Sequence, residues 1–337
     1  WRSFVAMAAT AALTVVLADL GIGRLSPPRY VREITDAVAE YEHEDPTTLV
    51  LGSSHARTFT VMDGLARART GGAARVLGVP LEVGKFTSYE WVLQHRLRPL
   101  IEEDGGKKRP SLRHFVLLTQ WWDACGADGD PPQTNIASRA WTFPYFFRDV
   151  ADHGLNDYNR NYLTSRWLEM WHGSVLVAAR GQDYAVAAIR ETLRPSSEEA
   201  LQKRYDDRLV DWQALQERGA LTMGHQKEMD AADRILAYFQ ARGVDVTLMV
   251  YPLLPTSITA ASRRGTLEPF VALMKGLAER RGVRFIDTTY DHDLESADWQ
   301  PDFDHLKPDA HVKFSNWLLD GKMSFLLPGK GEQGGAK

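Results

Sequence analysis

Cysteine is almost absent from this chain, and its scarcity removes two classes of site. The 337 residues contain one cysteine, Cys125. A single thiol cannot form an intramolecular disulfide or supply a multi-cysteine metal site. The sequence places no basic residue and no expected helix N-terminus beside Cys125, so we predict an inert thiol rather than a nucleophile.

A strong charge bias and a long basic run are also missing. The formal net charge is -4. Nucleic-acid binding depends on clustered Lys and Arg that neutralise phosphates, so we expect no nucleic-acid partner. The acidic stretch YDHDLESAD, which begins at Tyr290, has no second group of ligands at metal-binding spacing. We therefore expect no metal and no cofactor.

An apolar run occupies the N-terminus from Phe4 to Gly23, with Asp19 as its one charged residue. Its length is close to the roughly 20 residues that span a bilayer. Two interpretations stay open for residues 1–24, a transmembrane anchor and a signal peptide. We favour the anchor, because the run is longer than the usual hydrophobic segment of a signal peptide.

Strand and helix patterns alternate along the remaining chain. We expect a stalk at 25–46 that includes a short acidic helical stretch, a domain at 47–325 and a disordered tail at 326–337. Strands are predicted at 48–51, 74–79, 114–118, 244–252 and 283–287. Helices are predicted at 55–64, 84–101, 266–282 and 307–320, and a further helix that includes Ala232 is predicted to end at Gly243. This order predicts a flavodoxin-like three-layer α/β/α fold with a central, mostly parallel sheet.

A long insertion, about 124–223, interrupts the alternation and is rich in aromatic residues, among them Trp141, Tyr145, Trp167 and Trp171. Trp167 and Trp171 are spaced i, i+4 and would share one helix face. The section is either a helical cap that buries its rings or a surface that stacks on sugars or docks a partner. One element can do both.

Candidate catalytic residues cluster at the predicted carboxyl ends of the strands, where parallel sheets bind their ligands. Ser54 follows the first strand, and Asp302 and His305 follow the last one. A serine hydroxyl becomes a nucleophile when a base takes its proton and an acid orients that base. The Gly-Ser-Ser-His turn at 52–55 lacks the glycine spacing and the lysine of a phosphate-binding loop, which excludes that interpretation. His55 is the alternative base, although its side chain is expected to point along the helix.

These residues resemble the motifs of the SGNH/GDSL hydrolase family of esterases and acyltransferases. Gly52-Ser53-Ser54 is similar to the family's Gly-Asp-Ser turn, with Ser53 in place of Asp, and the segment 302–305 is similar to its Asp-x-x-His motif. The resemblance implies that Ser54 is the nucleophile, that His305 acts as base and then as acid, and that Asp302 orients His305.

The resemblance also implies an oxyanion hole that contains the N–H groups of Ser54 and Gly84. We prefer Gly84 to Gly78, because Gly84 directly precedes a helix whose Thr87 and Glu90 fit a capping box. The family's third motif reads Gly-x-Asn-Asp, whereas this chain has TQWWDAC, with Trp122 at the Asn position. Gln120 and Trp122 are the candidate replacement donors. Losing one oxyanion donor costs about 10²–10³ in rate, so a slow enzyme, a different donor and a specialised acyltransferase all stay open.

The N-terminal helix and the Gly-Ser-Ser turn resemble the membrane-anchored branch of the family, which works with membrane-bound O-acyltransferases on cell-surface polymers. This implies an extracytoplasmic body, in the periplasm or at the cell surface, that acts on acyl esters of a polysaccharide or another acylated small substrate. The alternative is a catalytically weak or inactive scaffold subunit of such a complex. A cytosolic lipase-like enzyme would require the N-terminal run to be a buried helix.

Overall fold

The computed structural model describes residues 29–81, 84–103, 107–108, 111–126, 222–258, 263–300 and 304–327, together with a few isolated positions. Several predictions lie outside the described residues. They are most of the anchor 1–24, most of the insertion, the tail from residue 328, and the side chains of Asp302, Trp141, Tyr145, Trp167 and Trp171.

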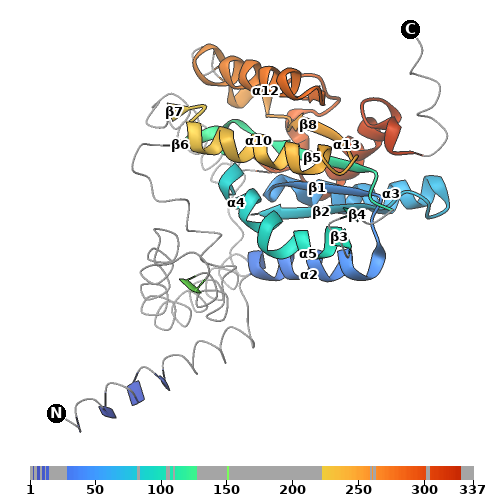
Figure 1. The fold of residues 1–337 in the computed structure, drawn as a ribbon. Helices are drawn as coiled ribbons and strands as arrows, with labels where there is room; N and C mark the ends of the chain where they lie inside the picture. Colours follow the sequence, from blue (N-terminus) through green and yellow to red (C-terminus); the bar gives the residue numbers. More distant parts are fainter. Residues whose placement is uncertain are drawn as a thin grey trace, which may run out of the picture.

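A five-stranded parallel sheet forms the centre of the fold (Figure 1). Its strands are β1 (Thr48–Ser53), β2 (Val76–Leu81), β5 (His114–Thr119), β8 (Asp245–Val250) and β9 (Arg284–Asp287), in the order β2-β1-β5-β8-β9. Every pairing in this sheet is parallel. The predicted α/β class and parallel sheet are therefore confirmed, and the strand order is that of flavodoxin-like folds.

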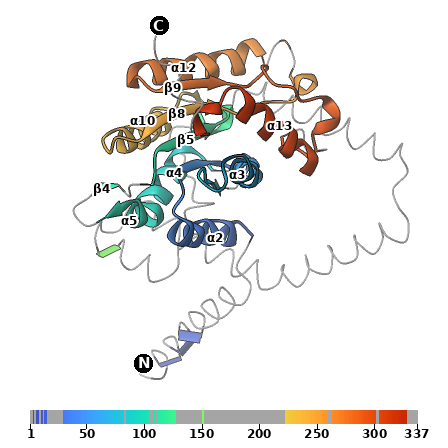
Figure 2. The ribbon, with the colours of Figure 1, turned by 90° about the vertical axis from the view of Figure 1, so that its right-hand side faces the viewer.

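Helices cover both faces of this sheet. Figure 2 shows α3 (Arg57–Thr70) and α13 (Pro308–Asp320) on one side, and α4 (Phe86–Val92) and α10 (Gln226–Gln240) on the other. The strands alternate accordingly, because successive strand residues point to opposite faces. Val50 and Val116 pack in the cluster that contains α3 and α13, whereas Leu49 and Leu117 pack in the cluster that contains α4 and α10.

Shorter elements complete the described chain. The remaining helices are α5 (Arg98–Ile101) and α12 (Glu268–Arg281), and the π-helical turns are η2 (Leu93–Leu97) and η5 (Arg263–Leu267). The 3-10 turns are η1 (Ser54–Ala56), η3 (Trp121–Ala124), η4 (Pro255–Ser257), η6 (Ser296–Asp298) and η7 (Ser324–Leu326). Two small antiparallel pairs join β3 (Glu102–Glu103) to β4 (Lys107–Lys108) and β6 (Cys125–Gly126) to β7 (Thr222–Met223).

The predicted stalk at 25–46 is wrong for its helical part. Residues 29–44 form α2 (Arg29–Glu44), which packs beside β2. Ile34, Ala37 and Tyr41 are buried in the core, and their i, i+3, i+7 spacing places them on one helix face. At the other end of the domain, Leu326 and Leu327 are also buried, so the packed body extends to residue 327.

The first predicted helix continues beyond its expected end at Gly64. Helix α3 continues to Thr70 and ends at Gly71, whose φ of 60° is left-handed. Gly64 does not end the helix because a helical backbone tolerates glycine at a modest cost of about 1 kcal/mol. The second strand, β2, lies two residues later than predicted, over Val76–Leu81.

Within the part of the chain that the structure describes, no helix combines the length and the apolar character needed to cross a membrane.

Candidate active site

Ser54 and His305 lie 251 positions apart in the sequence and meet at the carboxyl edge of the sheet. Ser54 begins η1 directly after β1, and His305 lies in the loop before α13. The Ser54 Oγ and the His305 Nε2 are 2.6 Å apart. Strand β1 lies between β2 and β5, where the strand order changes direction and parallel sheets form their ligand crevice. The structure thus brings the predicted nucleophile and the predicted base together.

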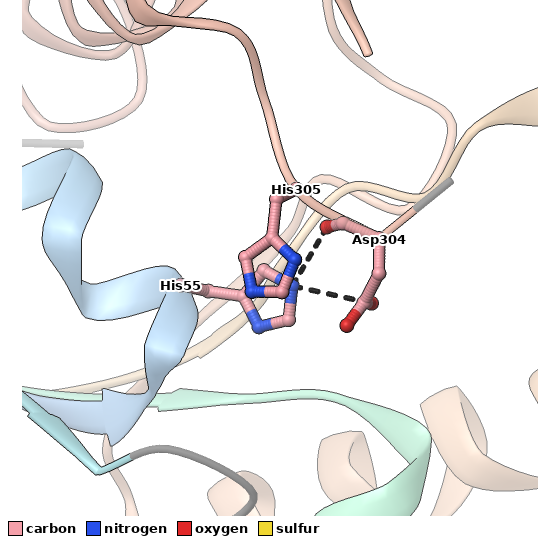
Figure 3. Close-up of side chains that lie close together, drawn as sticks. All are labelled: His55, Asp304 and His305. Carbon is pink, nitrogen blue, oxygen red and sulfur yellow. Dashed lines mark hydrogen bonds and ion pairs between the residues drawn. The ribbon is translucent and has the colours of Figure 1, made fainter. Parts of the chain in front are cut away.

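A second serine–histidine pair lies beside the first. The Ser53 Oγ is 2.6 Å from the His55 Nδ1, and the His55 Nε2 is 2.8 Å from the backbone oxygen of Asp304 and 3.2 Å from its Oδ1 (Figure 3). Both ring nitrogens of His55 are therefore engaged. The sequence analysis missed this arrangement, and spacing carried no signal for it because Asp304 is 249 positions away.

Access distinguishes the two pairs. His55 is 1% exposed and Ser53 is 3% exposed, whereas Ser54 is 7% exposed and His305 is partly exposed. A nucleophile and its base must be reached by the substrate, which favours Ser54 and His305. His55 then has a positioning role, because it bonds to Asp304, the neighbour of the base. Its ring also stacks on that of His305, with 5.0 Å between centroids and 9° between planes.

The same three residues, His55, Asp304 and His305, are close enough for a metal site, since their ligand atoms all lie within 4.8 Å of one another. The stacking argues against a shared ion. An imidazole nitrogen offers its lone pair in the ring plane, and two nearly parallel stacked planes do not meet at one point. The His305 Nε2 also lies against the hydroxyl of Ser54. We therefore assign the cluster to positioning of the base.

The positioning role of His55 leads to a prediction. His55→Ala should lower kcat on an ester substrate by about 10²-fold with little change in KM, because small displacements of a catalytic group are that costly. His55→Gln keeps a donor near Asp304 and should retain more activity than His55→Ala. Steady-state kinetics on the two variants measure this, and a wild-type kcat in His55→Ala would contradict the assignment.

The predicted oxyanion donor Gly84 is already engaged. Its N–H donates to the carbonyl oxygen of Leu81 at 3.0 Å. Gly78, the rejected alternative, has a packing role. A Cβ at this position would stand 2.4 Å from the carbonyl oxygen of Ala56, so glycine lets η1 approach β2. The Gly84 N–H is therefore bonded within its own turn, and Gly78 has a packing role.

The predicted capping box of the following helix is also wrong. Helix α4 begins at Phe86, and Thr87 bonds to Glu228 of α10 rather than to Glu90. The Thr87 N–H donates to the Glu228 Oε2 at 2.8 Å, and its hydroxyl donates to the Oε1 at 3.1 Å. Glu228 is 141 positions away, so the local sequence pattern could not reveal it.

The two other predicted donors lie in the turn after β5. The N–H of Gln120 donates to the Asp123 Oδ2 at 3.0 Å, which fixes the turn. The Gln120 side chain caps the same turn, and the Trp122 Nε1 is buried and has no hydrogen-bond partner among the described residues. An unpaired buried donor such as the Trp122 N–H is costly unless a ligand or water binds it. Trp122 therefore stays a candidate donor.

Buried ionisable groups support this turn from below. Asp123 is completely buried, and burial holds its pKa well above the usual range. Burial likewise raises the pKa of Tyr89, whose hydroxyl interacts with Asp123 and Ser53.

Burial raises the pKa of the Cys125 thiol to about 12, which leaves the thiolate scarce at neutral pH. This raised pKa agrees with the predicted inert thiol.

A buried polar chain links α3 to α13 beneath the site. The Thr58 Oγ1 is 3.0 Å from the Tyr251 hydroxyl and 2.8 Å from the His311 Nδ1. Burial, with smaller contributions from the charges of His305 and His55, lowers the pKa of His311 to about 4. His311 is thus neutral in the folded protein at neutral pH.

This pKa predicts an acid sensitivity of the fold. Between about pH 6.5, the usual pKa of histidine, and about pH 4, the unfolded state binds a proton at His311 that the folded state does not. The free energy of unfolding should therefore fall as the pH is lowered through this window. His311→Asn removes the titration, so its stability deficit relative to wild type should shrink from pH 7.5 to pH 5 in urea denaturation. A deficit that is constant with pH would contradict the prediction.

Comparisons with known proteins add a distant likeness. No protein-family model matches the chain, and no curated protein matches it either. Among solved structures, it is similar to a mutant of Axe2, an acetyl-xylooligosaccharide esterase from Geobacillus Stearmophilus. The TM-score is 0.41 and the identity is 11%, over 81% of this chain and 92% of that one. A likeness at this level carries no argument about the reaction, so function is argued from the geometry of the site.

Proposed function

We propose that this protein is a serine esterase or O-acyltransferase that acts on acyl esters, with acetyl as the favoured group. The observation that carries the proposal is the 2.6 Å contact between the Ser54 Oγ and the His305 Nε2 at the carboxyl edge of a parallel sheet. A serine hydroxyl paired with an accessible imidazole is the core of a nucleophilic acyl-transfer site.

The pair supports a two-step mechanism. The Ser54 Oγ attacks the ester carbonyl carbon while the His305 Nε2 takes the hydroxyl proton. The intermediate then expels the alcohol, which leaves with that proton, and an acyl-serine results. Water or a second hydroxyl attacks the acyl-serine by the reverse sequence, so the acceptor decides between hydrolysis and transfer. Asp302, by resemblance, orients the imidazole of His305.

The biological setting is proposed on the sequence features. An apolar N-terminal segment, 1–24, would anchor the protein with its body outside the cytoplasm. The substrate would then be an acylated polysaccharide of the cell envelope or an exported one. The aromatic residues Trp141, Tyr145, Trp167 and Trp171 are suited to stack on sugar rings or to contact a membrane-bound O-acyltransferase partner.

A scaffold role in an acyltransferase complex is the second candidate, and two observations favour it. Trp122 stands where the resemblance expects an asparagine. The N–H of Gly84 is bonded to Leu81. A cellular test separates the candidates. If the protein is a scaffold, Ser54→Ala should fully complement cells that lack the protein, whereas a variant without residues 141–171 should not.

The direct test uses the purified full chain in detergent. We expect it to release p-nitrophenol from p-nitrophenyl acetate and acetate from an O-acetylated polysaccharide such as acetylated xylan. Adding an unacetylated oligosaccharide should yield acetylated product if transfer competes with hydrolysis. A folded protein that turns over none of these esters and forms no acyl-serine would refute the enzymatic proposal and leave the scaffold role.

A further inference from the structure

Lys85 is a buried lysine whose charge the described contacts leave without an ion pair. It follows the end of β2 by four positions and is only 1% exposed. Its Nζ lies over the ring of Trp122, 5.2 Å from the centroid. Within the described ranges, no carboxylate forms an ion pair with it. Burying an ammonium in this way is costly, and an anion bound beside it would offset that cost.

The sheet order places the segments of Lys85 and Trp122 on either side of the strand that precedes the nucleophile. Strand β1 lies between β2 and β5 (Figure 1). Lys85 belongs to the segment that leaves β2, and Trp122 belongs to the turn that leaves β5. The contact between Lys85 and Trp122 thus joins the segments that leave the two strands flanking β1, the strand that Ser54 follows.

The Glu228 carboxylate interacts electrostatically with Lys85 and forms no ion pair with it among the described residues. Its carboxylate is 4% exposed and bonded to the N–H and the hydroxyl of Thr87. Burial raises the pKa of Glu228, and the charge of Lys85 opposes that rise. The two charges therefore interact through space, while the Lys85 Nζ itself lies 5.2 Å from the centroid of the Trp122 ring.

We propose that the Lys85 ammonium stabilises the oxyanion that forms when Ser54 attacks an ester, an inference that rests on the proposed function. As the Ser54 Oγ bonds to the carbonyl carbon, the C=O π electrons move onto the carbonyl oxygen, and His305 takes the serine proton. The ammonium offsets the new negative charge. When the C=O bond re-forms, the alkoxide leaves with the proton from His305. Lys85 thus takes the role of the asparagine amide that the resemblance expects at the position of Trp122.

The test compares Lys85→Met and Lys85→Arg with wild type and with Lys275→Met, an exposed lysine on α12 as the matched control. On the neutral ester p-nitrophenyl acetate, Lys85→Met should lose about 10²–10³-fold in kcat with KM nearly unchanged, the usual effect of removing one oxyanion donor. Lys85→Arg keeps the charge and should recover part of the loss, and Lys275→Met should match wild type. Circular dichroism spectra and melting temperatures show whether each variant is folded.

An anionic ester, mono-p-nitrophenyl succinate, separates the other readings. If Lys85→Met keeps the wild-type kcat on the neutral ester and loses only affinity for the anionic one, Lys85 recognises substrate charge and the oxyanion role is refuted. If Lys85→Met is as active as wild type on both esters, the oxyanion role is refuted as well. A loss of activity that the melting data attribute entirely to unfolding also refutes it. If wild type turns over neither ester, the proposed function fails and this inference fails with it. If wild type is active and Lys85→Met is unaffected, only this inference fails.

Discussion

Ser54→Ala should abolish ester hydrolysis, lowering kcat/KM on p-nitrophenyl acetate by about 10⁴-fold or more. The size follows from losing the nucleophile, which removes the covalent route and leaves only binding and electrostatic assistance. The hydroxyl of Ser54 is the one that lies 2.6 Å from the His305 Nε2. Initial rates of p-nitrophenol release on folded wild type and variant measure the effect.

The neighbouring serine provides a matched control. Ser53 is also buried and is also 2.6 Å from a histidine nitrogen, the His55 Nδ1. Ser53→Ala removes the same atom one position away, and we expect it to reduce kcat by no more than about tenfold, because it loses a positioning contact only. If Ser53→Ala is inactive while Ser54→Ala retains activity, the two pairs have been assigned in reverse.

His305→Ala should cost about as much as Ser54→Ala, on the order of 10⁴ in kcat. The imidazole takes the serine proton and returns it to the leaving group, so the two residues act as one unit. Their losses should not add, and Ser54→Ala/His305→Ala should be no slower than either single variant within about threefold. The measurement is a double-mutant cycle on kcat.

Independent effects would contradict the pairing. If the double variant lost the product of the two single losses, Ser54 and His305 would be acting separately. His311→Asn is the control for this cycle. It removes a nearby histidine of α13 that contacts Thr58 and not Ser54, so it should leave kcat nearly unchanged.

Most of the fold could be predicted, because periodic patterns determine the elements and parallel sheets have few topologies. The strands at 48–51 and 114–118 were predicted within two residues, and the carboxyl-edge argument anticipated that Ser54 and His305 would lie near each other. The helical stretch that became α2 was predicted as part of a stalk, and its packing in the core was missed although the signal was present. Ile34, Ala37 and Tyr41 form an apolar stripe within an acidic-looking segment.

The contacts that hold the site residues in place could not be predicted from the sequence, because they join segments that are far apart along the chain. Glu228 reaches Thr87 from 141 positions away, and Asp304 reaches His55 from 249 positions away. Lys85 was missed for a different reason. Lysines are almost always exposed, and nothing local in the sequence marks this one as buried.

The most direct test of the Ser54–His305 pair is labelling by a serine-reactive fluorophosphonate, followed by fragment-ion mapping of the modified peptide. We expect one phosphonate on Ser54, none on Ser53, no labelling of Ser54→Ala, and slow labelling of His305→Ala. Equal labelling of wild type and Ser54→Ala, or a phosphonate found on Ser53, would contradict it.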